Sequence, residues 1–262
     1  MKTVRIYQVD AFTSKLFGGN PAAICPLDEW LPDEVMQNIA LENNLAETAF
    51  IVKESAHYHI RWFTPAVEVD LCGHATLGAA HVLFNHENFN GENIVFHSRS
   101  GKLIVTKQGD ELTLDFPADV MNEVPVTAQL TAGFAEKPLQ AFRGKTDFML
   151  VFENEKQIAT MVPDLGKISE LEARGVIVTA QGNEVDFVSR FFAPQSGIDE
   201  DPVTGSAHTS LAPYWSGRLG KQTLSAVQLS KRKGFLTCTI AGDRVQISGK
   251  ACLYLTGEIF VP

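Results

Sequence analysis

The sequence predicts an α+β fold made of two similar halves, each with many short strands around one buried helix. The first observation is a long repeat, in which RWFTPAVEVDLCGHATLGAA begins at Arg61 and RFFAPQSGIDEDPVTGSAHTSLA begins at Arg190. The second is that GKLIVTKQGDELTLDF, from Gly101, recurs as GFLTCTIAGDRVQISG, from Gly234, with Gly-Asp at the turn of each. The offset is about 130 residues in both cases, and a chain of 262 residues fits two domains of that size. We place the domains at residues 1–117 and 118–262.

The first half is expected to contain strands on either side of two helices. Alternating apolar residues predict a strand at 3–12, and chain breakers predict a loop at Phe17-Gly18-Gly19-Asn20-Pro21. Proline at the start and acids in the first turn predict a helix at 32–43. The remaining expected elements are a strand pair at 48–53 and 57–63, an apolar helix at 73–85 and strands within 94–116, the last two joined as a hairpin.

The second half begins with a segment, 119–131, that we interpret as an irregular linker. Strands are then expected near 139–142, 148–152, 176–179 and 185–192, with a short helix near 164–173. A helix at 205–215 and four C-terminal strands complete this half. Because helices and strands do not alternate regularly, the pattern predicts α+β halves and not a series of βαβ units.

Composition and charge exclude several classes of protein. A hydrophobic content of 45% is ordinary for a globular chain, and no run approaches the roughly 20 apolar residues of a membrane span. A net charge of −9 argues against nucleic acid as a partner, because binding phosphates requires a basic face. The N-terminus lacks the apolar core of a signal peptide, and the four cysteines show no CxxC spacing. We therefore expect free thiols and a cytoplasmic protein.

The two repeated helix starts are the first candidates for a binding site. Glycine and small residues stand where backbone N–H groups lack partners within the helix, and such an end binds a carboxylate or phosphate without a cationic side chain. Each glycine could equally serve only to break the turn into its helix, but two matched sites in a duplicated chain favour ligand binding. The expected substrate-binding residues are Gly73, Ala75, Gly205, Ser206 and Ala207.

Three side chains near these helix starts are candidates for acid/base chemistry. Glu47 has small and apolar neighbours, which favour the protonated form of a carboxyl and suit a group that gives and takes protons, although an ordinary exposed loop Glu is the alternative. His74 lies near Asp70 at a helix N-terminus, where the dipole disfavours the charged imidazole. Asp201 precedes the second helix and serves either as its cap or as a ligand contact opposite His74.

Other patterns carry less weight. Cys72 stands at a helix N-terminus, an environment that lowers the pKa of a thiol, unless it is simply a core residue. His57 and His59 share one strand face but have no cluster of Cys, Asp or Glu nearby, so we expect no metal site. The sequence contains no Walker loop, no GxGxxG pattern and no GxSxG elbow.

Four segments resemble the phenazine-biosynthesis PhzF-like family of isomerases: FGGNPAAI, ENNLAETAFIV, RWFTPAVEVDLCGHATLGAA and RFFAPQSGIDEDPVTGSAH. The resemblance implies the fold of diaminopimelate epimerase, with two pseudo-symmetric domains, each a barrel-like mixed sheet around a central helix, and a site in the cleft between them. It also implies that the final strand, near 252–261, belongs to the first domain. A homodimer that needs no metal or organic cofactor is implied as well.

Carried over by motif, Glu47 in NLAET matches the family's catalytic acid/base, and His74, Asp201 and Ser206 match its other active-site positions. The related epimerases use two cysteines, one from each half, whereas Cys72 has no counterpart in the second motif of this chain. A single base is therefore expected. The sequence predicts a cofactor-independent isomerase or epimerase that moves a proton on a small carboxylate metabolite. A non-catalytic binder of such metabolites and a racemase that uses Cys72 as a base are the alternatives.

Overall fold

The computed structural model describes residues 2–262, which separate into two compact units. The first unit contains the chain up to Asp115 together with Ser248–Pro262, and the second contains Phe116–Ile247. The first unit is thus built from two separate stretches of sequence. The boundary expected after residue 117 lies close to the end of the first stretch.

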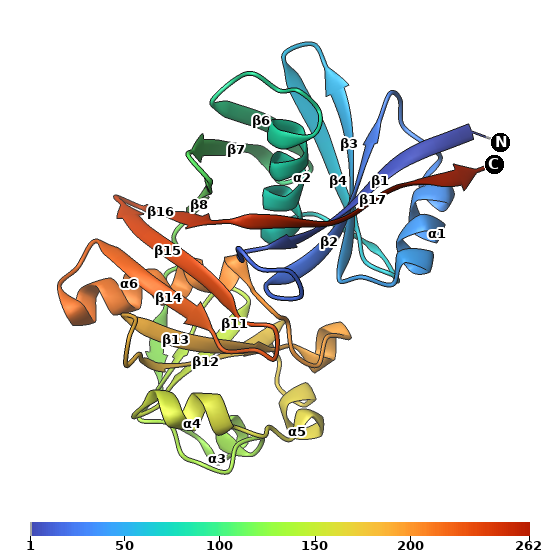
Figure 1. The fold of residues 1–262 in the computed structure, drawn as a ribbon. Coiled ribbons are helices and arrows are strands. Elements are labelled where there is room, and N and C mark those ends of the chain that lie inside the picture. Colours follow the sequence, from blue (N-terminus) through green and yellow to red (C-terminus); the bar gives the residue numbers. More distant parts are fainter. Residues whose placement is uncertain (1) are drawn as a thin grey trace. The chain divides into compact units, whose positions relative to one another are not determined.

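The first unit is a mixed sheet. Its strands are β1 (Lys2–Ala11), β2 (Asn20–Leu27), β3 (Glu47–Glu54), β4 (His57–Phe63), β5 (Glu68–Val69), β6 (Asn93–Ser98), β7 (Gly101–Gln108), most of β8 (Glu111–Pro117) and β17 (Ala251–Val261). They pair in the order β17–β1–β2–β3–β4–β6–β7–β8, with β5 beside β4. The pairs β2/β3 and β4/β6 are parallel and the other pairs are antiparallel. In Figure 1 the dark red β17 runs beside the dark blue β1.

The second unit repeats this plan. Its strands are β9 (Asn122–Val124), β10 (Gln140–Arg143), β11 (Asp147–Val151), β12 (Gly175–Gln181), β13 (Phe187–Phe192), β14 (Thr223–Gln228), β15 (Gly234–Ala241) and most of β16 (Arg244–Gly249). They pair in the order β9–β10–β11–β12–β13–β14–β15, and β11/β12 and β13/β14 are parallel. From β10 to β15 the pairs alternate between antiparallel and parallel as they do from β1 to β7. The duplication in the sequence is therefore also present in the strand pairing.

Each unit buries one long helix. In the first unit α2 (Gly73–Asn85) packs on β1, β2, β3 and β17 and is buried on nearly every side, as an apolar helix surrounded by strands must be. In the second unit α6 (Gly205–Leu219) packs on β14 and β15. The other helices are α1 (Asp33–Asn43), α3 (Ala128–Thr131), α4 (Glu155–Thr160), α5 (Leu165–Ser169) and the 3₁₀ turn η1 (Pro194–Ser196).

Two apolar clusters fill the units. In the first unit, α1 packs on strands β1 to β3, and Met36 and Phe50 are fully buried there. In the second, Leu150 and Val178 from neighbouring strands meet Ile158 of α4. Each cluster includes side chains from the parallel strands, β2 and β3 or β11 and β12, whose starts carry the candidate site residues.

The sequence missed β2 and α4. Strand β2 contains Pro21 and Pro26, which argue against a strand, but β1 pairs with it on one side and β3 on the other. Helix α4 begins with a capping box in which Asn154 and Gln157 each bind the other's backbone N–H. The segment expected to be an irregular linker in fact contains β9 and α3, whereas α5 is shorter than the helix expected there.

Candidate active site

The first unit brings Glu47, Cys72 and His74 together at the N-terminal end of α2. Glu47 is the first residue of β3, Cys72 is the N-cap of α2 and His74 is the second residue of that helix. The Nε2 atom of His74 lies 3.1 Å from Oε2 of Glu47, and its Nδ1 atom lies 3.5 Å from Sγ of Cys72. The Glu47 side chain is only 12% exposed, so it is not an ordinary loop carboxylate.

The facing atoms of His74 and Glu47 have unused hydrogen-bonding capacity. Although they are close, neither Nε2 nor Oε2 makes a well-aligned hydrogen bond to the described residues. An unsatisfied buried polar atom costs about 1–3 kcal/mol. Such a pair is poised to accept a third polar or acidic group between or beside its two members, as a proton-transfer site requires.

Burial and the neighbouring charges shift the pKa of His74 in opposite directions. Burial lowers the pKa of His74, whereas negative charge on Cys72 and on Glu47 raises it well above its ordinary value. Burial, reinforced by the Glu47 charge, raises the pKa of Cys72 to about 11. Of the two alternatives for Cys72, the core residue is therefore supported and the lowered thiol pKa is not, because burial outweighs the dipole. Near neutral pH Cys72 is a thiol and contributes no charge to His74.

A fourth side chain, Asn20, completes the group and was missed in the sequence. It is fully buried at the first position of β2, and its Nδ2 atom lies 3.2 Å from Nδ1 of His74. The preceding Gly19 has φ +59°, and a Cβ there would lie 2.0 Å from the carbonyl oxygen of Ala11. Glycine at this position is what allows the chain to deliver Asn20 to His74. The sequence clue was the motif FGGNPAAI, which predicted a loop and supported the family resemblance but gave no role to Asn20.

The second unit gathers Asp201, Thr204 and Ser206 at the start of α6. Thr204 is the N-cap, and its hydroxyl donates to Oδ2 of Asp201 at 2.5 Å while its backbone N–H donates to Oε1 of Gln228 at 2.8 Å. Asp201 therefore binds the N-cap residue and does not itself cap the helix. Side-chain caps are absent at the starts of both α6 and α2. The N–H of Ala207, however, donates to the carbonyl of Thr204 at 3.2 Å, and the N–H of Ala75 binds the Cys72 sulfur, so these two residues lack the unpaired N–H groups expected of them.

Arg174 joins this second group and was also missed. It directly precedes β12, and its guanidinium binds both carboxylate oxygens of Asp147, with a distance of 2.9 Å from Nε to Oδ1. Nη2 of Arg174 also donates to Oγ of Ser206 at 3.0 Å. Asp147 is buried at the first position of β11, whereas the Arg174 side chain is 39% exposed. A planar cation held from behind by a buried carboxylate can present its open side to an anion. The segment LEARGV matches no motif that could have revealed this.

Some expected contacts do not form. Asp70 is exposed, and its carboxylate lies 3.9 Å from Arg99, so the carboxylate partner of His74 is Glu47.

His59 has an exposed carboxylate neighbour, Glu54, with 2.5 Å between Nε2 and Oε2. The ligand atoms of Glu47, Cys72 and His74 lie within 4.8 Å of one another, close enough to share a metal ion. The expectation that the protein needs no metal stays a prediction.

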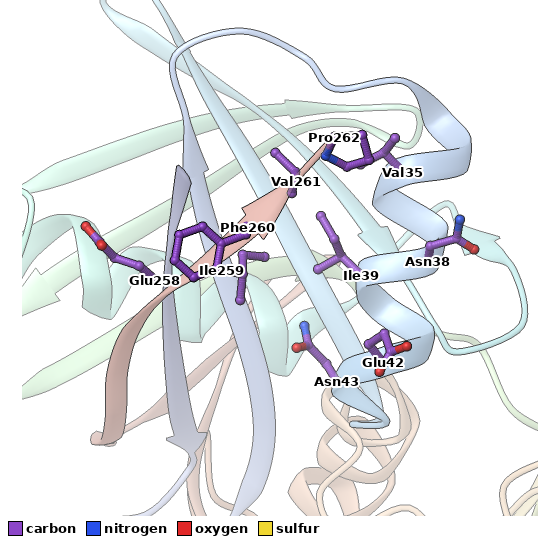
Figure 2. A pocket seen from close by; sticks show the side chains of 10 residues that line it. All are labelled: Val35, Asn38, Ile39, Glu42, Asn43, Glu258, Ile259, Phe260, Val261 and Pro262. Carbon is purple, nitrogen blue, oxygen red and sulfur yellow. The ribbon is translucent and has the colours of Figure 1, made fainter. Parts of the chain in front are cut away.

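A groove elsewhere in the first unit contains none of these residues. It has a volume of about 490 Å³ and lies between α1 and the end of β17 (Figure 2). Its lining is mostly apolar and includes Ile39, Phe260 and Val261, and among the described residues it offers no paired acid and base. Along the described chain, no helix combines the length and the apolar character needed to cross a membrane.

Comparison with known proteins places this geometry in a family. The phenazine biosynthesis-like protein family, PhzC-PhzF, matches residues 9–257. A Pseudomonas aeruginosa protein named as an uncharacterized isomerase is 52% identical over 257 residues, with 98% of each chain covered. The crystal structure of a PhzF family protein from Enterococcus faecalis has a TM-score of 0.97 at 49% identity, and covers 99% of this chain and 100% of its own.

A more distant similarity confirms the fold class. The structure of a hydroxyproline epimerase from Agrobacterium vitis has a TM-score of 0.62 at 10% identity, over 98% of this chain and 92% of the epimerase. The α+β, epimerase-like fold expected from the sequence is thereby confirmed. With a match across nearly its whole length and named isomerases among its relatives, this chain belongs to the phenazine biosynthesis-like family of proteins and is an isomerase.

Proposed function

We propose that this isomerase moves a proton on a small carboxylate metabolite, with Glu47 as the group that removes and returns it. The observation that carries the proposal is the buried pair of Glu47 Oε2 and His74 Nε2, 3.1 Å apart, neither of which is satisfied by the described residues. Carboxylates in such surroundings are suited to proton transfer. No step in this mechanism requires a metal ion or an organic cofactor.

In the proposed reaction, Glu47 alone can take up and return the proton. Glu47 takes a proton from carbon, the electron pair of the broken C–H bond passes into the adjoining conjugated or carbonyl group, and the protonated Glu47 returns the proton at the same or another atom. The negative charge then lies on the substrate, and His74, whose imidazole is beside the same carboxylate, is proposed to donate a hydrogen bond to it. Water must be kept away from such an intermediate, and the burial of both side chains provides this.

The second unit supplies the proposed carboxylate-binding group. Gly205 and Ser206 begin a helix for which the described residues supply no side-chain cap, and the Arg174 guanidinium donates to the Ser206 hydroxyl. Backbone N–H groups and a guanidinium together favour a carboxylate ligand. Asp201, which accepts from Thr204, is proposed to orient an amino or hydroxyl group of the substrate. That both groups act on one substrate is predicted from the duplicated sequence.

Two observations favour one base over a pair of thiols. The pKa of Cys72 is raised to about 11, so the thiolate that a racemase would need is scarce at neutral pH. In the second unit the N-cap position held by Cys72 in α2 is held by Thr204, and the buried Cys238 lies within β15. A mechanism with one cysteine from each half therefore has no second thiol at the corresponding helix start.

The test is hydrogen exchange with solvent. The protein is incubated in D2O with a panel of small amino, hydroxy and cyclohexadiene carboxylic acids, and deuterium uptake at carbon is followed by NMR. We expect uptake with at least one acid, and a loss of about 10²- to 10⁴-fold in Glu47→Gln with binding retained. Glu42→Gln, which changes an exposed carboxylate on α1 in the same way, is the matched control and should exchange at the native rate.

Each outcome of this experiment separates two functions. Unchanged exchange in Glu47→Gln would remove Glu47 from the mechanism. Saturable binding of an acid without exchange at any carbon would favour a metabolite-binding protein over an enzyme of this type. Loss of exchange in Cys72→Ser, with Glu47→Gln unaffected, would favour the thiol-based racemase.

A further inference from the structure

We infer that Asn20 is a positioning residue that fixes one tautomer of His74, the neutral form with its proton on Nε2, facing Glu47. The consequence for catalysis rests on the proposed function, since it concerns the basicity of Glu47. The hydrogen-bonding state of His74 itself does not depend on it.

Two hydrogen-bond donors converge on Nδ1 of His74. The Nδ2 amide group of Asn20 lies 3.2 Å away and the Sγ atom of Cys72 lies 3.5 Å away. An amide NH₂ can only donate, and a neutral thiol can donate its hydrogen to a nitrogen lone pair. Nδ1 must then carry a lone pair and no proton.

The other ring nitrogen faces an acceptor. Nε2 lies 3.1 Å from a carboxylate oxygen of Glu47, and an ionised carboxylate can only accept. A proton on Nε2 and none on Nδ1 is the arrangement that all three neighbours support. Glu47 and Cys72 are the titratable groups that contact His74, and the rise in the His74 pKa depends on negative charge on both. With Cys72 as a thiol, only the Glu47 charge opposes burial, which is the largest single influence on the ring and favours its neutral form.

A neutral ring matters for the base. An imidazolium beside Glu47 would stabilise the carboxylate as half of an ion pair and make it a weaker base. The neutral tautomer turns its N–H toward Glu47 without a full positive charge, and so leaves the carboxylate free to take a proton. By occupying Nδ1 with a donor, Asn20 opposes the second protonation that would form the imidazolium.

The fold holds Asn20 firmly in this place. Asn20 pairs with Ala11 in the β1/β2 ladder, so its position is set by two strands. The loop before it is fixed as well, because the Phe17 backbone N–H donates to Oδ2 of Asp10 at 2.9 Å and Gly19 lies against the backbone of Ala11. A donor on a strand end is positioned more accurately than one on a free loop.

The same chain contains two reference histidines. Nδ1 of His208 lies 2.9 Å from the backbone carbonyl of Thr204, which can only accept, so His208 has the opposite tautomer with its proton on Nδ1. Nδ2 of Asn85 lies 3.2 Å from Nδ1 of His81 near the exposed end of α2, an amide–imidazole pair like that of Asn20 and His74. Asn85→Asp is therefore the matched control for Asn20→Asp.

The experiment reads the ring directly, without substrate. Protein labelled with ¹⁵N-histidine is examined by two-dimensional NMR that correlates ring nitrogens with ring protons, from pH 5 to pH 9. We expect His74 to show a protonated Nε2 and a bare Nδ1 at pH 7.5, with His208 showing the reverse. In Asn20→Asp, His74 should be flanked by two carboxylates and titrate at least about one pH unit higher. In Asn20→Leu, which has a similar shape, the Nε2–H form should lose its dominance.

Activity is the second readout. With the panel acid that exchanges, Asn20→Asp should lower kcat about tenfold or more while KM changes little, and should shift the pH profile upward. Asn85→Asp should alter the titration of His81 and leave exchange unchanged. A native spectrum showing His74 protonated on Nδ1, or doubly protonated at pH 7.5, would overturn the inference even if Asn20→Asp did not fold. Failure of exchange with a native Nε2–H ring would count against the proposed function only.

Discussion

The starts of the two buried helices have the same construction but carry different chemistry. In the first unit the start of β2, the start of β3 and the second residue of α2 are Asn20, Glu47 and His74. In the second unit the start of β11, the residue before β12 and the second residue of α6 are Asp147, Arg174 and Ser206. In each set the side chain at the second strand contacts the side chain on the helix, at 3.1 Å in one and 3.0 Å in the other.

The difference lies in charge and in proton exchange. The first set contains a carboxylate and an imidazole, which change protonation between pH 4 and pH 8 in ordinary surroundings, whereas a guanidinium stays charged and cannot deliver a proton. The positions recur in both units while the residues differ: one set contains the pair proposed for proton transfer and the other the cation proposed to hold an anion. A duplicated fold therefore need not carry the same chemistry in both of its units.

Other paired features are structural. Arg61 binds both carboxylate oxygens of Glu68 and lies over the Phe63 ring, and Arg190 binds Glu200 and lies over Phe192 in the same manner. The repeated Arg-aromatic-Phe motif therefore clamps the loop that leads into each helix. At the fourth residue of each helix, Thr76 and His208 both reach back to the carbonyl of the N-cap residue.

The largest predicted effect concerns that fourth residue. Burial lowers the pKa of His208 to about 4, below the ordinary value near 6.5. Between these values the unfolded chain binds a proton that the folded chain does not, so His208 contributes stability above pH 6.5 that is lost as the pH falls toward 4. Urea unfolding should show a loss of about 2–3 kcal/mol from this group between pH 7 and pH 4.5. His208→Thr, which installs the residue of the first unit, should flatten that slope; an equal slope in the variant would contradict the prediction.

The two arginine clamps should differ in strength. Removing Arg190 leaves Glu200 and the carbonyls of Ile158 and Met161 without this donor, whereas Glu68 still has Arg99 at 2.6 Å when Arg61 is removed. Arg190→Met should therefore destabilise the protein by about 2 kcal/mol more than Arg61→Met. Urea unfolding of the two variants at pH 7 measures the difference. Equal losses would mean that the clamps are equivalent despite their different surroundings.

The smallest effect sharpens the contrast between chemistry and binding. Arg174→Gln keeps a donor near Ser206 but removes the charge, and should raise KM for the exchanging acid about tenfold while changing kcat less. Arg218→Gln, on an exposed position of α6, is the control and should leave both constants unchanged. A fall in kcat without a change in KM would place Arg174 in the proton-transfer step.

The sequence predicted the duplication and both buried helices, and it named Glu47 and His74 as candidates, which the structure brings together; these rest on repeats and on a motif that the chain shows directly. It could not identify Asn20 or Arg174. Their roles arise only when parallel pairing brings residues 20 and 47, or 147 and 174, to neighbouring strand ends beside a helix. Of the two alternatives for Cys72, a lowered thiol pKa or a core residue, the structure supports the core residue, and the burial that decides between them depends on packing that no local pattern reveals.

The return of β17 to β1 makes the first unit depend on contacts between residues that are far apart in the sequence. Lys2 pairs with Val261, so β1 has β2 on one side but gains its second neighbour only when residues 248–262 join the unit. The second unit, residues 116–247, is contiguous and needs no such closure of a long loop. On refolding from denaturant we expect the second unit to reach its native state first, because distant contacts form slowly.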